Sequence, residues 1–571
     1  MARIREIQIA NFRCIQQLTW TPSPGINCLV GPDDSGKSSI LDAIDFCLGA
    51  RRALAFTDAD FHRLDVSKPI TITVTVGELD DALKSMETYG NYLRSFDDLL
   101  GIIEDEPEVL AETVLSIRLT VGSDLEPVWT LVSERAEAAG HSRFLTWSDR
   151  ARIAPTRLGA LADHNLAWRR GSVLNRLSDE RPEMAAALAD AARNARVAFG
   201  NAADAQLGAT LRTVEQTAKE LGIPIGDGLK AMLDAHTVSF SGGTIALHGS
   251  DGVPLRGLGV GSVRLLLAGL QRKAAEQATV VLIDELEYGL EPHRILRLLG
   301  SLGAKETKPP LQAFITTHSP VAVRELRGGQ LYVVRKTADS HKATLVGDDD
   351  AIQGTIRLYP DALLAPSVIV CEGASEVGLL RGMDLFRASQ NQTTLTAAGV
   401  AWVDAKGVDQ LYDRARPFQN LGYRVAVLRD DDVRPNPADE QAFVARGGTV
   451  FRWRDGCALE KELFYCLSNQ AAEQLLQRAV DLLDEDLVDE HIRSASGGHC
   501  DYADATLIRG FDGEVRTFLG DAARSKRGSW FKSVTKMEDV ARDIVFPNLA
   551  TSDVIFRQTI ASLEQWLFRG P

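Results

Sequence analysis

The chain has 571 residues, 45% of them hydrophobic and 25% charged, so it is too long for one small binding module and too apolar for a disordered or fibrous protein. Its 63 basic and 78 acidic residues give a formal net charge of −15, so nucleic acid would have to be contacted through a local basic surface or bridging cations. The sequence shows neither a signal-peptide pattern nor an apolar stretch near the roughly 18 residues that cross a bilayer, which predicts a cytoplasmic protein without membrane contact. The seven cysteines form no C-x-x-C pair, which favours free thiols over zinc modules.

The first motif is a phosphate-binding loop. An apolar run at 26–30 predicts a buried strand, Gly31-Pro32-Asp33-Asp34-Ser35-Gly36-Lys37-Ser38 matches G-x-x-x-x-G-K-[ST], and the apolar spacing of 38–48 predicts a helix. In such a loop the backbone N–H groups surround the phosphates, the lysine reaches the outer phosphates and the serine hydroxyl can ligate Mg²⁺. The predicted ATP-binding residues here are Gly31, Asp34, Ser35, Gly36, Lys37, Ser38 and Ser39.

A second apolar strand, at 279–283, ends in Asp284 and Glu285. We expect Asp284 to belong to the Mg²⁺ shell and Glu285 to orient the attacking water. A third strand, at 312–316, precedes His318, which taken alone is as consistent with an ordinary histidine at a strand end as with a functional one.

The order of these motifs resembles the ATP-binding-cassette (ABC) ATPases of the SMC and RecF type, over residues 1–345. The likeness includes Gly259-Val260-Gly261-Ser262, which is similar to the family signature, and Thr317-His318-Ser319-Pro320. The resemblance implies that Gly259, Gly261 and Ser262 cap the ATP of an opposite subunit, that His318 senses the γ-phosphate, and that the protein is a homodimer or a higher homo-oligomer.

The stretch between Lys37 and Asp284 is longer than an ATPase core needs, so it should contain an insert. Residues 84–112 have acidic, helix-like spacing, and 157–235 are rich in alanine and leucine, which predicts a helical arm or dimerisation element or, more plainly, solvated helix faces over an ordinary core. Alternation at 237–240 and 244–247 predicts strands that return to the ATPase sheet.

The second half begins after a polar stretch at 345–362. A predicted strand at 367–371 leads into Glu372 and Glu376, and another at 423–428 leads into Asp430 and Asp432. Carboxylates gathered at the carboxyl ends of parallel strands repel one another unless a cation is shared, which predicts Mg²⁺ or Mn²⁺; the alternative for 430–432 is a solvated acidic turn.

Glu372-Gly373-x-x-Glu376 and Asp430-x-Asp432 resemble the Toprim domain. A cassette ATPase followed by a Toprim domain resembles the OLD (overcoming lysogenization defect) nucleases, which include the nuclease subunit of Gabija antiphage systems. The resemblance implies an α/β fold with an ABC-type ATPase domain over 1–345 and a C-terminal Toprim domain over 362–571. It also implies one or two divalent metals, whose ligands would be Glu372, Glu376, Asp430, Asp432 and Glu460.

The segment Ser529-Trp530-Phe531-Lys532 is similar to a family segment whose lysine serves catalysis, which implies a catalytic Lys532. The surrounding residues 524–536 contain five basic residues and no acid, which fits either a DNA-facing patch or a solvated basic loop. Of the two branches of the family, this segment looks more like the one that works beside a UvrD-like helicase.

The sequence thus predicts an ATP-binding, divalent-metal-dependent endonuclease acting on double-stranded DNA, in which the ATPase regulates the Toprim nuclease, in antiphage defence or DNA processing. Two alternatives stay open. A DNA-repair ATPase of the SMC or RecF type would have no use for the acids of the second half, and a topoisomerase-like Toprim enzyme would need a tyrosine-bearing cleavage domain that the sequence does not identify.

Overall fold

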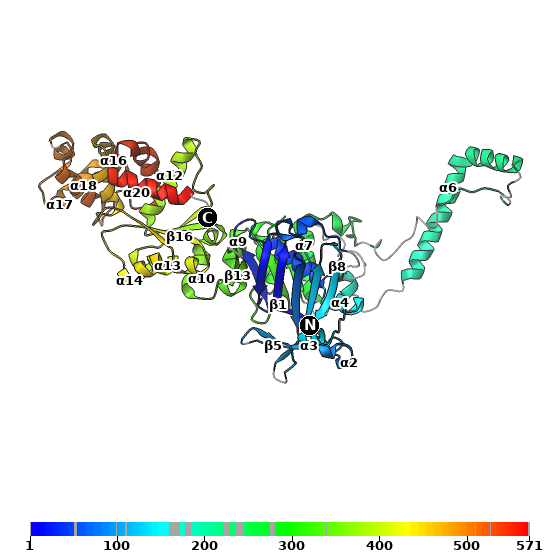
Figure 1. Ribbon diagram of the computed structural model, residues 1–571. Coiled ribbons are helices and arrows are strands. Elements are labelled where there is room, and N and C mark those ends of the chain that lie inside the picture. Colours follow the sequence, from blue (N-terminus) through cyan, green and yellow to red (C-terminus); the bar gives the residue numbers. More distant parts are fainter. Residues whose placement is uncertain are drawn as a thin grey trace. The chain divides into compact units, whose positions relative to one another are not determined.

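The computed structural model describes residues 2–50, 54–98, 100–108, 111–158, 172–177, 184–221, 223, 226, 228–233, 245, 247–274, 280–337, 340–508, 510–525 and 527–568. Its contacts divide the chain into two compact units, the first comprising 1–28 and 38–322 and the second 29–37 and 323–571 (Figure 1). The predicted domain limits of 1–345 and 362–571 stay a prediction.

The strands of the ATPase half are β1 (Arg3–Phe12), β2 (Ile15–Trp20), β3 (Ile26–Val30), β4 (Ile70–Gly77), β5 (Leu93–Asp97), β6 (Ile102–Glu104), β7 (Glu112–Val121), β8 (Pro127–Val132), β9 (Thr156–Arg157), β10 (Val280–Ile283), β11 (Gln312–Thr316), β12 (Leu331–Lys336) and β13 (His341–Leu345). Its helices are α1 (Lys37–Leu48), α2 (Met86–Tyr89), α3 (Glu134–Ala138), α4 (Trp147–Ile153), α5 (Val173–Leu177), α6 (Met184–Glu220), α7 (Val260–Lys273), α8 (Pro292–Ser301), α9 (Pro320–Glu325), α10 (Asp350–Leu358) and α11 (Pro360–Leu364).

Two sheets organise these strands. A seven-stranded sheet has the order β2-β1-β4-β7-β5-β6 with β8 paired to β7, and a six-stranded sheet has the order β13-β12-β3-β11-β10-β9. The strand before the phosphate-binding loop, β3, is buried at all five residues, as a strand covered on both faces should be. The parallel partners β10 and β11 bring Ile283 beside Ile315, so the residues that follow both strands meet at one edge of the sheet.

The predicted helical region at 84–112 is wrong. Only α2 and one short turn are helical there, and β5 and β6 form an antiparallel hairpin whose first strand also pairs with β7. Leu93, Ser95 and Phe96 of β5 are buried, and Asp105, one of the acids in this region, forms ion pairs with Arg94 and Arg135. Pairing with β7 therefore outweighs the local pattern.

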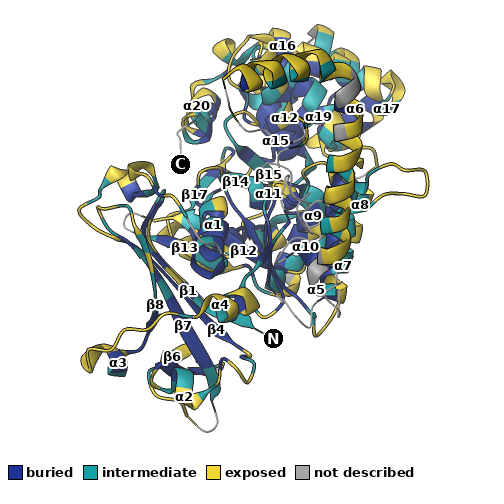
Figure 2. Ribbon diagram, turned by 90° about the vertical axis from the view of Figure 1, so that its right-hand side faces the viewer, coloured by how far each residue is buried: buried dark blue, intermediate teal, exposed yellow. Residues whose placement is uncertain are grey.

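The alanine-rich part of the insert is helical, as predicted. Helix α6 contains 37 residues, and Figure 2 shows it exposed along most of its length. The strands predicted at 237–240 and 244–247 fall mainly outside the described residues.

The C-terminal part has the strands β14 (Ser367–Cys371), β15 (Val400–Asp404), β16 (Arg424–Arg429) and β17 (Thr449–Arg452), and the helices α12 (Ala374–Ser389), α13 (Val408–Asn420), α14 (Pro437–Ala445), α15 (Leu459–Cys466), α16 (Asn469–Leu482), α17 (Glu485–Ala495), α18 (Gly513–Ala523), α19 (Val534–Val540) and α20 (Val554–Phe568). The four strands form a parallel sheet in the order β15-β14-β16-β17. Helix α12 packs on one face of this sheet, and α13 and α14 pack on the other (Figure 1). Because β14 and β16 are parallel neighbours, their carboxyl ends lie at the same edge of the sheet.

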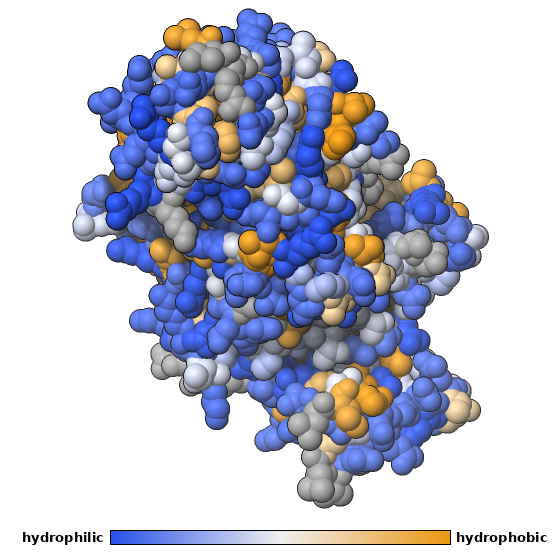
Figure 3. Space-filling model, turned by 90° about the vertical axis from the view of Figure 1, so that its left-hand side faces the viewer, coloured by the Kyte–Doolittle hydropathy of each residue, from blue (hydrophilic) through white to orange (hydrophobic). Residues whose placement is uncertain are grey.

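Among the described helices, none combines the length and apolarity needed to cross a membrane. The face drawn in Figure 3 is mostly hydrophilic, with hydrophobic residues in small separate groups. All seven cysteines are free thiols, in agreement with the sequence.

Candidate nucleotide and metal sites

The phosphate-binding loop joins β3 to α1, as predicted. Lys37, the first residue of α1, donates from Nζ to the carbonyl oxygens of Gly31 (2.9 Å) and Pro32 (2.7 Å). Gly31, Asp34 and Gly36 all have positive φ angles, so the loop turns its N–H groups inward. A buried lysine, a glycine-rich turn and a helix N-terminus together form a cradle for the phosphates of a nucleotide.

Asp284 lies where a magnesium ligand is predicted. Its Oδ1 accepts hydrogen bonds from the hydroxyls of Ser38 (3.0 Å) and Thr316 (2.6 Å). The Glu285 N–H donates to Thr316 Oγ1 (2.8 Å), and Glu285 has a φ of 48° with an exposed side chain. The two neighbouring acids therefore have different surroundings, as their different predicted roles require.

Two arginines beside these acids were not predicted. Arg157 Nη2 lies 3.6 Å from Asp284 Oδ2. Arg264 of α7 is 1% exposed and donates to the carbonyl oxygens of Asp284 (3.1 Å), Glu285 (3.0 Å) and Tyr288 (2.8 Å). The signal available in the sequence was a lone arginine inside the apolar run that follows the signature residues. Arg264 links the signature helix to the turn that follows β10.

The signature residues begin α7. Gly259 is the N-cap, Gly261 and Ser262 lie in the first turn, and Arg294 of α8 donates from Nη1 to Ser262 Oγ (2.8 Å). His318 is exposed, and its backbone N–H donates to Glu287 Oε1 (2.8 Å). The roles of Gly259, Gly261 and Ser262 toward a second subunit's ATP, and of His318 toward the γ-phosphate, stay predictions.

In the C-terminal sheet the structure brings three predicted acids together. Glu372 follows β14, Asp430 and Asp432 follow β16, and one carboxylate oxygen of each lies within 4.8 Å of the other two. The Asp430 N–H donates to Glu372 Oε2 (3.0 Å), and the Leu459 N–H donates to Asp430 Oδ1 (2.9 Å). These bonds hold the carboxylates in place despite their repulsion. We call the cluster of Glu372, Asp430 and Asp432 the carboxylate site.

Glu376 and Glu460 lie behind this cluster. Both are at most 3% exposed, Glu376 Oε2 accepts the Gly373 N–H (3.0 Å), and the Ser375 hydroxyl donates to Glu460 Oε1 (2.6 Å). Glu376 Oε1 is buried and has no hydrogen-bond partner among the described residues. Burial, with Asp430 and Glu460 close by, raises the pKa of Glu376 well above its ordinary value.

Asp431, between the predicted ligands Asp430 and Asp432, does not join the carboxylate site and contacts two arginines instead. Its side chain is 0% exposed and accepts from Arg429 (3.0 Å), from Arg452 (3.1 Å) and from the Gly456 N–H (3.2 Å). Burial alone would raise the pKa of Asp431, but these donors lower it. Alternate residues after a strand thus face opposite sides, as predicted, and 430–432 is not a plain solvated turn.

Lys532 is positioned by buried neighbours. Trp530 and Phe531 are fully buried, and Trp530 Nε1 donates to His491 Nδ1 (3.2 Å), whereas Lys532 is exposed. The next helix, α19, can pack closely on α12 because Gly378 of α12 has no side chain. A Cβ at this position would lie 2.6 Å from the Val534 carbonyl oxygen. The segment that carries Lys532 is thereby fixed against the helix that carries Glu376.

Lys532 is among the charged residues that affect the pKa of Glu372. Burial raises the pKa of Glu372 and Asp432 adds to this rise, while the Asp430 N–H, Arg429 and Lys532 oppose it. Arg524, expected on a DNA-facing patch, forms an ion pair with Asp432 instead. Lys526 of the same basic segment lies outside the described residues, and Arg527 is exposed.

These residues fit a divalent cation. Three carboxylates within 4.8 Å and a buried carboxylate oxygen on Glu376 without a hydrogen-bond partner among the described residues provide hard oxygen donors. Glu372, Asp430 and Asp432 form the cluster, and the predicted ligand roles of Glu376 and Glu460 stay predictions.

The fold and the two sites define a P-loop ATPase joined to a Toprim domain. Residues 26–324 match the family described as "AAA domain, putative AbiEii toxin, Type IV TA system", and residues 363–432 match "Overcoming lysogenization defect protein-like, TOPRIM domain". The chain belongs to the first of these families and carries a Toprim domain of the OLD type, so the resemblance drawn from the sequence is confirmed.

Individual proteins and solved structures are also similar to parts of this chain. The OLD nuclease of Thermus scotoductus is 26% identical over 483 residues, which cover 77% of this chain and 83% of that protein. The replication and repair protein RecF of Chlorobium phaeobacteroides is 29% identical over 112 residues, 18% of this chain and 31% of that protein. The Smc head domain of Pyrococcus furiosus, solved with a ScpA domain, covers 60% of this chain and 96% of its own at 14% identity and a TM-score of 0.34.

Proposed function

We propose that the protein is an ATP-binding, divalent-metal-dependent endonuclease that cuts double-stranded DNA at the carboxylate site. The observation that carries this proposal is the convergence of Glu372, Asp430 and Asp432 at the carboxyl edge of a Toprim sheet. The OLD-like Toprim domain favours a nuclease over a repair ATPase without nuclease activity. The likeness to an OLD nuclease over most of the chain favours it over a topoisomerase.

In this mechanism the acids bind the metal and Lys532 contacts the phosphate. Glu372, Asp430 and Asp432, supported by Glu376 and Glu460, would hold Mg²⁺ or Mn²⁺, which when bound supplies positive charge for the attacking and leaving oxygens of a phosphodiester. Lys532 is exposed close to Glu372, so its ammonium can approach the phosphate oxygens on which negative charge accumulates. Arg524 can release Asp432 as DNA or metal binds.

Incubation of the purified protein with supercoiled plasmid and Mg²⁺ or Mn²⁺ tests the proposal. We expect nicked and linear DNA in the presence of either metal and none in EDTA. Relaxed, covalently closed circles would indicate a topoisomerase, and DNA binding without any strand break would indicate the repair ATPase.

ATP binding should depend on Lys37. Lys37→Ala removes the ammonium that would face the outer phosphates, so we expect nucleotide affinity to fall below detection in isothermal titration. Glu285→Gln should bind ATP normally and hydrolyse it more slowly, and the exposed Lys68→Ala serves as the matched lysine control. Unchanged ATP affinity in Lys37→Ala would contradict the assignment.

We also propose that the protein self-associates and that ATP binding regulates the nuclease through this association. Ser262 and its neighbours at the start of α7 would complete the nucleotide site of a second copy, and the exposed α6 offers a further contact surface. Light scattering of the Glu285→Gln variant with ATP should therefore give at least a dimer at micromolar concentration. A monomer under these conditions would contradict the proposal.

A further inference from the structure

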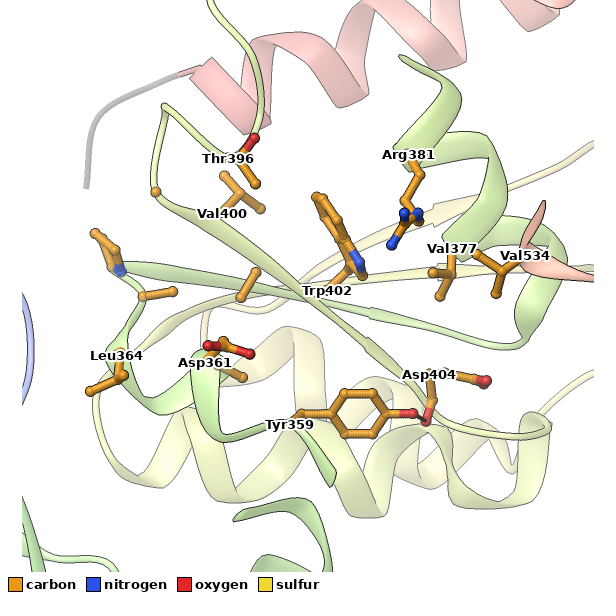
Figure 4. Close-up of a pocket in the computed structure, with 15 residues that line it drawn as sticks. Tyr359, Asp361, Leu364, Val377, Arg381, Thr396, Val400, Trp402, Asp404 and Val534 are labelled. Atoms are coloured by element: carbon orange, nitrogen blue, oxygen red, sulfur yellow. Dashed lines mark hydrogen bonds between the residues drawn. The ribbon is translucent and has the colours of Figure 1, made fainter. Parts of the chain in front are cut away.

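A cavity of about 700 Å³ lies along the open edge of the Toprim sheet (Figure 4). The edge strand is β15, which pairs only with β14 in the described sheet. Trp402 of β15 lines the cavity together with Arg381 of α12 and Asp361 of α11. A volume of this size is within the several-hundred to roughly 1,000 Å³ range of pockets that hold small organic groups.

The cavity borders the carboxylate site through three elements. Val377, which lines the cavity, directly follows Glu376, and Val534, also in its lining, lies two residues after Lys532. Asp404 ends β15, and the loop behind it is bonded to the strand that carries Glu372, since the Gly407 N–H donates to the Glu372 carbonyl oxygen (2.8 Å). The cavity and the carboxylate site are thus built on the same three elements, so one bound DNA strand can reach both.

The walls suit a flat, neutral ring with amino groups. Figure 4 shows Trp402 in the middle of the cavity wall, with Arg381 directed into the cavity from α12. The two carboxylates of the lining, Asp361 and Asp404, outnumber the one guanidinium, Arg381, which also pairs with Glu538. This charge disfavours a phosphate. Carboxylates instead accept hydrogen bonds from the exocyclic amino groups of cytosine, adenine and guanine, and an indole stacks on any base.

We propose that this cavity binds an unpaired base of the DNA strand that is being cut at the carboxylate site. The inference rests on the proposed nuclease function, because it takes the same DNA as its ligand. A base inside a duplex is covered on both faces, so it can stack on Trp402 only after it leaves the stack or where the strand is already single. The cavity would then hold the strand in register with the acids, and it would favour DNA with unpaired or easily opened positions.

The experiment uses the full chain in EDTA, so that no strand is cut, and two DNA oligonucleotides. One carries a single unpaired 2-aminopurine in a short gap, and the other has the same 2-aminopurine in an intact duplex. Wild-type protein should quench the unpaired probe. Trp402→Leu, which keeps apolar bulk but loses the stacking surface, should abolish the quenching and weaken binding of the gapped DNA about tenfold while leaving duplex affinity unchanged. Trp402→Phe should retain most of both signals.

Leu385→Ala, at an exposed position of α12 outside the cavity lining, is the matched control and should behave like wild type. Equal quenching in wild type and Trp402→Leu, or equal weakening of gapped and duplex DNA, would overturn the inference. Tight binding of free 2-aminopurine deoxyriboside would overturn it in favour of a free nucleoside, and Trp402-dependent binding of an extended peptide but not of gapped DNA would indicate strand addition to β15.

Plasmid cleavage is measured in parallel. Cleavage without Trp402-dependent quenching refutes only the proposed base-binding cavity, and quenching without cleavage refutes only the proposed nuclease function.

Discussion

Glu372→Gln and Asp430→Asn are each expected to lower plasmid nicking by about two orders of magnitude or more, because each removes a charge that holds the metal in the carboxylate site. Both replacements keep the shape of the side chain, and an amide oxygen at 430 can still accept the Leu459 N–H. ATP turnover should persist, since its predicted residues lie around Asp284 and Lys37. Gel assays of nicked and linear DNA measure the loss of cutting, and phosphate release measures the ATP turnover.

Asp455→Asn is the control for this pair. Its carboxylate belongs to the same domain, is 74% exposed and contacts only Arg452 among the ion pairs of the described chain. Normal cutting by either Glu372→Gln or Asp430→Asn would contradict the assignment of these acids to the metal site. Loss of cutting by Asp455→Asn as well would point to a general effect of charge on DNA binding.

Lys532→Ala should lower the cleavage rate about a hundredfold or more while DNA affinity changes by less than about fivefold. A fixed ammonium near developing negative charge stabilises the transition state more than the ground state, by about 2 to 4 kcal/mol for a preorganised donor. Trp530 and Phe531 remain buried in the variant, so the segment should keep its position. Single-turnover cleavage at saturating protein, with binding measured separately, distinguishes the two effects.

Lys536→Ala is the matched control, because Lys536 belongs to the same basic segment but lies within α19. A DNA-binding lysine would show weaker binding that low salt restores, with nearly normal cleavage at saturation. If Lys532→Ala behaves in this way, Lys532 contacts the DNA backbone and does not act in catalysis.

Local patterns predicted the parts of both sites that follow directly from a strand. The strand, loop and helix around Lys37, the strand before Asp284, and the two strands that end at Glu372 and Asp430 are all confirmed, because a buried parallel strand and the turn after it are encoded within a few residues. The sharing of one cluster by Glu372 and Asp430 followed from the parallel sheet.

Contacts between distant residues could not be predicted in this way. In the sequence Arg264 looks like an ordinary charged residue and Arg524 like part of the basic segment 524–536. Only the fold shows that the first contacts the turn after β10 and that the second pairs with Asp432. The strand β5 was missed for the same reason, since its pairing with β7 outweighed helix-like spacing. The cavity beside Trp402 has no sequence motif, because residues of at least four separate elements, α11, α12, β15 and α19, line it.

The opposite orientations of neighbouring acids after β16 affect how a mutational scan of this chain would have to be interpreted. Alanine at 430, 431 or 432 should abolish cutting at all three positions, yet the middle one would do so by unfolding the domain. Asp431 is a fully buried partner of Arg429, and its loss leaves that buried guanidinium with Glu440 as its remaining acidic partner, which destabilises the domain. Loss-of-function scores alone would therefore count three metal ligands. Thermal melting of each variant would separate Asp430 and Asp432, which are proposed to hold the metal, from Asp431, which stabilises the loop.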